Sequence, residues 1–173
     1  MVSPSPKKDL SRFVYCSSLL EEKIAKVYEN LAKVINDDLF KCLFRYIASD
    51  SLKHAEFFRA LSKWLNPDIE LSYEECAEVW GEKWKVVMEH AEVFQEKGKI
   101  NHEELSSLID GLEKLEGMVA EEYLTIMHIR LIQLMAEDRK IDLDYFKKIL
   151  EWIIEDENRH EQILKTIKSK LIK

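Results

Sequence analysis

Apolar residues recur at spacings of three and four residues in four long stretches of the sequence. These stretches run over residues 17–35, 39–65, 102–137 and 144–171. The spacing places the apolar side chains on one stripe of an α-helix. Only four Gly and three Pro occur in 173 residues, too few for the many turns of a sandwich or barrel. The sequence therefore predicts an all-α fold.

Short polar breaks group the four predicted helices into two hairpins. Residues 36–38 (Asn-Asp-Asp) separate the first helix from the second, and residues 138–140 (Asp-Arg-Lys) separate the third from the fourth. Residues 66–101 join the hairpins and contain a shorter predicted helix over residues 73–96. This is the connectivity of ferritin-like four-helix bundles with a long crossover, here carrying an extra helix. We expect an N-terminal extension over residues 1–16 and a single domain over residues 17–173.

Charge and hydropathy exclude several classes of function. The net charge of -7 argues against nucleic acid as a partner, because phosphate binding needs a basic face. The apolar runs are shorter than the ~18 residues of a membrane-spanning helix, and no secretory signal is recognisable. We therefore expect a cytoplasmic protein that binds no membrane. Sparse Asn and Gln with plentiful Glu, Lys and Ile favour a thermophilic source.

The three cysteines do not form a recognisable motif. Cys16, Cys42 and Cys76 are widely separated, and no Cys-x-x-Cys pair occurs. An odd number of isolated cysteines argues against a disulfide framework and against a zinc site built from thiolates. We expect all three to be buried as small hydrophobic residues.

A Glu-x-x-His motif formed by Glu157 and His160 is the strongest candidate for chemistry. Residues three apart share one face of a helix, and both fall in the apolar stripe of the fourth helix. A buried carboxylate and imidazole are costly unless they are paired or bind metal. His54 holds the corresponding position in the second helix. Mixed carboxylate and imidazole ligands suit iron, manganese or zinc, whereas calcium prefers oxygen alone.

With these motifs the sequence resembles the ferritin-like superfamily, and within it the rubrerythrin and bacterioferritin branch. The resemblance rests on Glu157-x-x-His160, on His54-Ala55 and on Glu21-x-x-x-Ala25-x-x-Tyr28. It implies a di-iron or di-manganese site in the bundle core, with oxidase-like or peroxidase-like chemistry. Iron is the metal it implies first, with manganese or zinc as alternatives. Three separated cysteines exclude the four-cysteine rubredoxin domain of rubrerythrins.

We assign the remaining ligands by two criteria. One is the face of the helix on which a residue lies, and the other is its level along the bundle, counted in residues from the nearest turn. On the first helix, Glu21 borders the apolar stripe and lies level with His54, each about 16 residues from the turn between them. On the third helix, Glu116 lies in the stripe and repeats the surroundings of Glu21. Glu121 instead lies level with His160. We favour Glu121 slightly, with Glu116 close behind.

The second helix departs from the family pattern at Ser51. This serine stands three residues before His54, where the resemblance implies a glutamate. A neutral hydroxyl is a poor ligand beside a carboxylate, so the neighbouring Asp50 becomes a candidate. The full set of candidate metal ligands is Glu21, Asp50, His54, Glu116, Glu121, Glu157 and His160.

Two functions remain open. One is a metal-binding protein whose substrate, if it is an enzyme, is a metal ion or a small oxidant. The other is a helical scaffold or interaction protein with a degenerate, non-catalytic site. We also expect a homodimer, for which Trp80, Trp84 and Phe94 of the crossover are candidate contact residues.

Overall fold

The computed structural model describes residues 5–93, 100–137 and 143–171. Within these ranges the regular elements are all helical, which confirms the predicted all-α fold. They are α1 (Pro6–Val34), α2 (Asp38–Leu65), α3 (Tyr73–Trp80), α4 (Glu82–Val93), α5 (His102–Thr125), the π-helical turn η1 (Ile126–Arg130), α6 (Leu131–Glu137) and α7 (Asp144–Leu171). No helix in the described ranges is long and apolar enough to cross a membrane.

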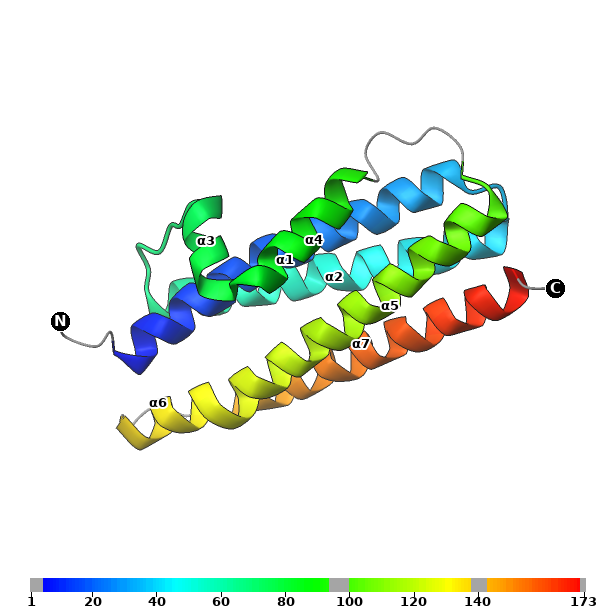
Figure 1. Cartoon of the computed structure of the whole chain (residues 1–173). Helices are drawn as coiled ribbons and strands as arrows, with labels where there is room; N and C mark the ends of the chain where they lie inside the picture. The colour runs from blue at the N-terminus through cyan, green and yellow to red at the C-terminus, as the bar shows by residue number, and fades with distance from the viewer. Residues whose placement is uncertain (1–4, 94–99, 138–142, 172–173) are drawn as a thin grey trace. The chain divides into compact units, whose positions relative to one another are not determined.

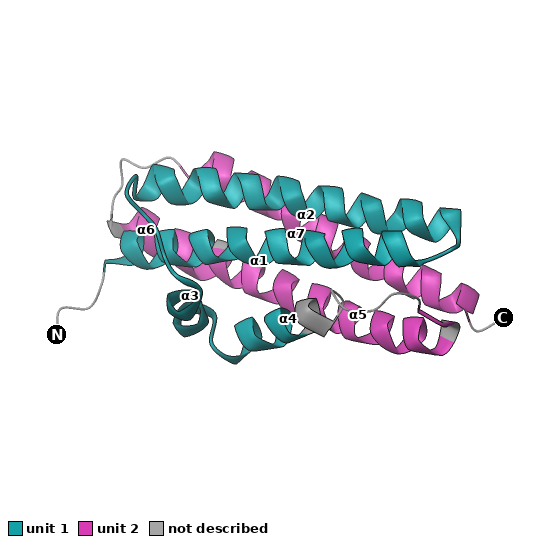
Figure 2. Cartoon of the chain, turned by 90° about the horizontal axis from the view of Figure 1, so that it is seen from above, with its two compact units in different colours: residues 1–99 teal, residues 100–173 magenta. Residues whose placement is uncertain are grey.

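The chain divides into two compact units, residues 1–99 and residues 100–173 (Figure 2). Unit 1 contains the α1–α2 hairpin with α3 and α4, and unit 2 contains the hairpin of α5 and α7 with η1 and α6. The two predicted hairpins are thus present. The predicted single domain over residues 17–173 stays a prediction.

In unit 1, α1 and α2 lie side by side along their length (Figure 1). The backbone N–H of Lys8 donates to the side chain of the N-cap Ser5, and Pro6 follows, a combination that favours a helix start. Most of the expected N-terminal extension therefore belongs to α1, and Leu10 and Phe13 are part of the core. The apolar stripe of the first helix, predicted from residue 17 onwards, therefore begins about two helical turns earlier.

The crossover consists of two helices where we predicted one. Gly81 separates α3 from α4 with a φ of 67°, a left-handed conformation that favours glycine. Both helices contact α1. Cys76 of α3 forms a disulfide with Cys16 of α1, so the expectation against disulfide bonding was wrong. The two cysteines are 60 positions apart in the sequence, so local spacing does not reveal this pairing. Cys42 is free and exposed, so its expected burial was also wrong.

The crossover tryptophans are core residues of the chain. Trp80 stacks on Phe13 of α1 with a centroid distance of 4.9 Å. Trp80 and Trp84 are only 6% and 4% exposed, so neither presents the contact surface that we expected. Phe94, the third residue of that expected surface, lies outside the described residues.

Replacing Gly81 with Ala is expected to lower the free energy of unfolding by about 1–3 kcal/mol, because a Cβ disfavours a positive φ. Gly117 is the matched control, since it lies within α5 and a Cβ added there meets no atom within 4 Å. Gly117→Ala is expected to raise the free energy of unfolding by about 0.5–1 kcal/mol. Urea denaturation measures both. A neutral Gly81→Ala would contradict the assigned backbone conformation.

In unit 2, α5 and α7 lie side by side (Figure 1). Asn101 and Glu104 form a capping box at the start of α5. Lys168 of α7 pairs with Asp110 of α5. The third predicted helix, over residues 102–137, runs through α5, η1 and α6, so a π-helical turn interrupts it. The fourth has the predicted bounds, 144–171.

Candidate metal centre

Three ligating side chains converge in the core of unit 2. α5 contributes Glu116, and α7 contributes Glu157 and His160. One ligand atom from each lies within 4.8 Å of the others. The Nδ1 atom of His160 is 3.4 Å from a carboxylate oxygen of Glu116 and 3.6 Å from one of Glu157. None of the three side chains is more than 1% exposed, so water does little to stabilise their charges.

Burial sets the electrostatics of this group. Burial and, to a smaller extent, the nearby Glu157 carboxylate raise the pKa of the Glu116 carboxyl, His160 opposes them, and the net pKa is about 7. Burial by itself lowers the pKa of His160, but hydrogen bonds with Glu116 and Glu157 outweigh it and raise that pKa to about 11. Two buried carboxylates beside one imidazole thus favour a positive charge among them. Either a proton or a metal cation meets that requirement.

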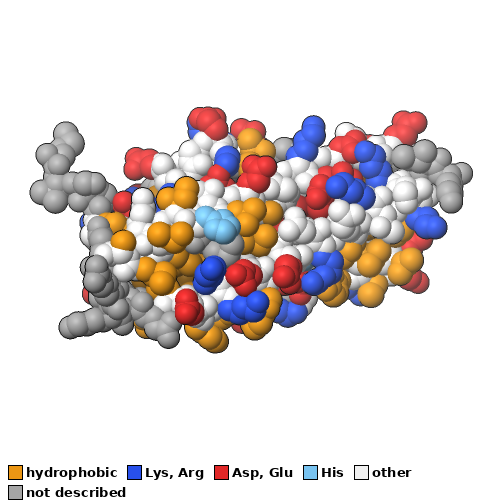
Figure 3. Space-filling view, turned by 90° about the horizontal axis from the view of Figure 1, so that it is seen from below, with side chains coloured by type: hydrophobic (Ala, Val, Ile, Leu, Met, Phe, Trp, Pro, Cys, Tyr) orange, Lys and Arg blue, Asp and Glu red, His pale blue; other side chains and the backbone are white. Residues whose placement is uncertain are grey.

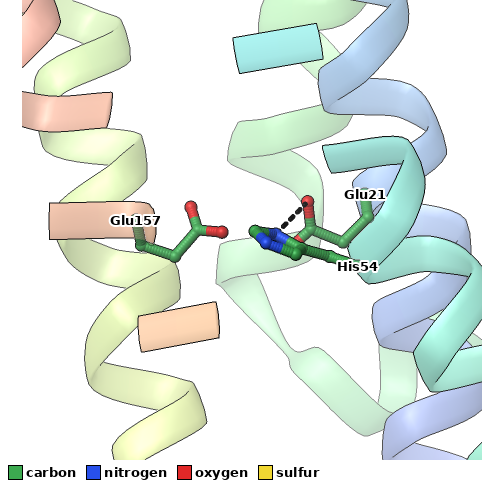
Figure 4. A group of neighbouring side chains, drawn as sticks. All are labelled: Glu21, His54 and Glu157. Atoms are coloured by element: carbon green, nitrogen blue, oxygen red, sulfur yellow. Dashed lines mark ion pairs between the residues drawn. The ribbon is translucent and has the colours of Figure 1, made fainter. Parts of the chain in front are cut away.

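A second buried pair lies in unit 1, between Glu21 of α1 and His54 of α2. The Nδ1 atom of His54 is 3.9 Å from a carboxylate oxygen of Glu21, the contact drawn as a dashed line in Figure 4. Both side chains are buried. The antiparallel course of the hairpin brings them together, as the count of residues from the turn predicted.

A family model described as Rubrerythrin matches residues 16–168. The chain belongs to the rubrerythrin family. Comparisons with curated proteins and with solved structures found no match. The family match confirms the resemblance seen in the motifs, and with it the ferritin-like class of the domain. In the described chain two of the three cysteines form the disulfide, so no four-cysteine rubredoxin cluster can be built from them.

The slight preference for Glu121 over Glu116 as the third-helix ligand is corrected. Glu116 is buried against His160, whereas Glu121 is exposed. Five residues at about 100° each turn Glu121 some 140° away from the face of Glu116. The count of residues from the turn favoured Glu121, but such a count does not tell which face of the helix a residue occupies. In this rubrerythrin-family chain, the apolar stripe predicted the buried glutamate better than the count of residues did.

Asp50, the candidate ligand beside Ser51, forms an ion pair with a basic residue of its own helix. It is buried, but its carboxylate accepts a hydrogen bond of 2.8 Å from the ammonium of the exposed Lys53. Its counterpart in the fourth helix, Asp156, pairs in the same way with Arg159 at 2.5 Å. Each aspartate thus forms an ion pair with the basic residue that directly precedes a core histidine.

Ser51 occupies the position of a missing carboxylate. Its side chain is fully buried, and its hydroxyl has no hydrogen-bond partner within the described part of the chain. It stands three residues before His54, as Glu157 stands before His160. The residues that the structure does bring together, Glu21 with His54 and Glu116 with Glu157 and His160, were all candidates from the sequence.

Proposed function

We propose that this rubrerythrin-family chain is a metal-binding protein whose ion is held by Glu116, Glu157 and His160. The convergence of two carboxylates and one imidazole within 4.8 Å in a buried core carries this proposal. Two carboxylates supply two negative charges, which balance one divalent cation. The cation in turn compensates for the desolvation of those charges.

Iron is the metal that we propose first, with manganese or zinc as alternatives. A mixed oxygen and nitrogen donor set suits these first-row ions better than calcium or magnesium, which take oxygen ligands. When bound, iron or manganese would supply one-electron chemistry toward a small oxidant, the oxidase-like or peroxidase-like activity we propose. The protein residues would hold the ion through carboxylate oxygens and a neutral imidazole nitrogen, and the apolar core would restrict access of water.

Metal content per chain tests this proposal. The untagged protein is stripped with a chelator, titrated without oxygen with Fe(II), Mn(II) or Zn(II), and analysed by elemental analysis. We expect at least one equivalent to bind at micromolar concentration. If none of the three ions binds, the scaffold function replaces the metal-binding one. In that case the His160–Glu116 contact would serve only to satisfy buried polar groups.

We also propose that the chain forms a homodimer through an apolar patch on unit 2. The patch consists of the exposed side chains Leu124, Ile129, Ile132 and Met135, and hydrophobic side chains gather on the face that Figure 3 shows. An adjacent pocket of about 190 Å³ is lined by one acid and one base, Asp144 and Lys147, beside His128 and apolar residues. The pocket lining thus carries one negative and one positive side chain, on a chain of net charge -7. Two copies can meet there with little repulsion.

Ile132→Asp is expected to convert the dimer into monomers, because it would bury a carboxylate at the centre of the proposed contact. Leu39→Asp is the control, since Leu39 is 66% exposed and lies in unit 1. Sedimentation velocity at micromolar concentration measures both variants. A wild-type chain that sediments as a monomer at all accessible concentrations would contradict the proposal.

A cytoplasmic location remains our proposal, and the disulfide restricts it. Structural disulfides persist inside cells mainly in hyperthermophiles. The Cys16–Cys76 bridge is therefore compatible with the cytoplasm if the source is thermophilic, as the composition favours. A mesophilic source would therefore argue against the cytoplasmic location.

A further inference from the structure

We propose that unit 1 carries a binding pocket for a small aromatic carboxylate, where the crossover helices α3 and α4 pack against α1. The pocket has a volume of about 440 Å³, which falls within the range of small-molecule sites. Its lining residues come from all three helices and are Lys23, Tyr73, Trp84, Lys85, Met88 and Glu89. The proposal concerns unit 1 alone and does not depend on the metal centre proposed in unit 2.

The helices that carry the lining residues are held together within unit 1. α3 and α4 contact each other, and both contact α1 (Figure 1). The Cys16–Cys76 disulfide joins α3 to α1, and Trp80 of α3 stacks on Phe13 of α1. The pocket is therefore formed before a ligand arrives, which lowers the entropic cost of binding.

Two aromatic rings and a thioether line the pocket. The rings of Tyr73 and Trp84 have centroids 5.9 Å apart and planes tilted by 56°. Trp84 is 4% exposed and Tyr73 is 53% exposed, so Trp84 forms part of the floor while Tyr73 belongs to the rim. Met88 adds a polarisable sulfur, which contacts aromatic rings favourably. These three side chains favour a ligand that contains an aromatic ring.

The charges around the pocket favour a ligand with a single negative charge. Lys85 is already balanced within α4, because its ammonium is 2.9 Å from Glu82 and also interacts electrostatically with Glu89. Lys23 of α1 has no ion-pair partner among the described residues. Its ammonium is therefore the cation that can bind a ligand carboxylate. A dianion such as a phosphate monoester would have too little positive charge to balance it, and Glu89 would repel it.

Isothermal titration of the full-length protein with cinnamate tests the proposal, and cinnamamide is the matched uncharged ligand. We expect cinnamate to bind with a Kd below about 1 mM, and cinnamamide to bind about tenfold more weakly, because the amide cannot form the charged contact with Lys23. Failure of cinnamate to bind would overturn the proposal. Equal affinities for the two compounds would overturn it as well.

Two pairs of variants locate the site. Lys23→Met removes the ammonium and should weaken cinnamate binding to about the level of cinnamamide with the wild type. Lys26→Met is its control, because Lys26 lies one turn further along α1 and does not line the pocket. Tyr73→Ala should weaken cinnamate binding about fivefold. Its control is Tyr145→Ala, which changes an exposed tyrosine of unit 2 and should leave the affinity unchanged.

The tested side chains are partly exposed, so these substitutions should leave the fold of unit 1 intact. An equal loss of cinnamate affinity in Lys23→Met and Lys26→Met would overturn the proposal, because it would show that the carboxylate responds only to the overall charge of the chain. A Tyr73→Ala variant that binds cinnamate as tightly as the wild type would also overturn it.

Discussion

Replacing Glu116 with Gln is expected to lower the affinity for metal on the order of 100-fold or more. The substitution keeps the volume and shape of the side chain but removes one of two negative charges facing His160. Loss of groups that merely orient a ligand costs about 10–100-fold in affinity, and loss of a ligand's charge should cost no less. Substitution of Glu121, five residues along the same helix and exposed, should leave the affinity unchanged.

Isothermal titration with Mn(II) or Zn(II) measures this difference, and chemical denaturation measures it independently. At a metal concentration of 100 times the wild-type Kd, binding stabilises the folded protein by about 2.7 kcal/mol. A variant that binds 100-fold more weakly would gain only about 0.4 kcal/mol under the same conditions. If Glu121→Gln weakens binding and Glu116→Gln does not, Glu121 replaces Glu116 as the assigned ligand, as the count of residues from the turn favoured.

Breaking the Cys16–Cys76 disulfide is expected to lower the free energy of unfolding by about 4 kcal/mol. The two sulfurs are 60 residues apart in the chain. A cross-link that closes a loop of this length restricts the unfolded chain by about that amount in the chain-entropy model. The bridge also attaches α3 to α1, where Trp80 stacks on Phe13. Loss of the bridge should therefore loosen the crossover first.

Guanidinium denaturation of Cys76→Ala, and of the wild type with and without a thiol reductant, measures this effect. Cys42→Ser is the control, because Cys42 is free and exposed. It should match the wild type under oxidising conditions. Identical unfolding midpoints for oxidised and reduced wild type would show that the bridge does not contribute to stability. A mass spectrum showing three free thiols would show that the bridge does not form.

Most of the secondary structure was predictable because helix periodicity and capping are local properties. The predicted starts of α2, α5 and α7 lie within a residue or so of the observed starts, since Asp37 and Asn101 cap their helices from adjacent positions in the chain. The start of α1 was missed, although Ser5 and Pro6 carried the same kind of local signal. The break at Gly81 was missed because one glycine in a helical pattern is tolerated as often as it ends a helix.

The candidate site was predictable where the evidence lay on one helix face. Glu157 and His160 are three residues apart, so the motif alone placed them together. The pairing of His54 with Glu21 followed from counting outward from a short turn, because α1 and α2 are regular helices. The same count in the second hairpin favoured Glu121, which is exposed. Only the burial of Glu116 against His160 distinguished the two candidates.

The sequence by itself determined the all-α class, the two hairpins, the Glu-x-x-His motif and the odd serine at position 51. These are properties of residues close together in the chain, where spacing alone decides which side chains share a face. Tertiary structure decided the Cys16–Cys76 bridge, the burial of Trp80 and Trp84, and the burial of Glu116 against His160. These long-range contacts depend on how the helices pack. A one-dimensional pattern does not contain that packing.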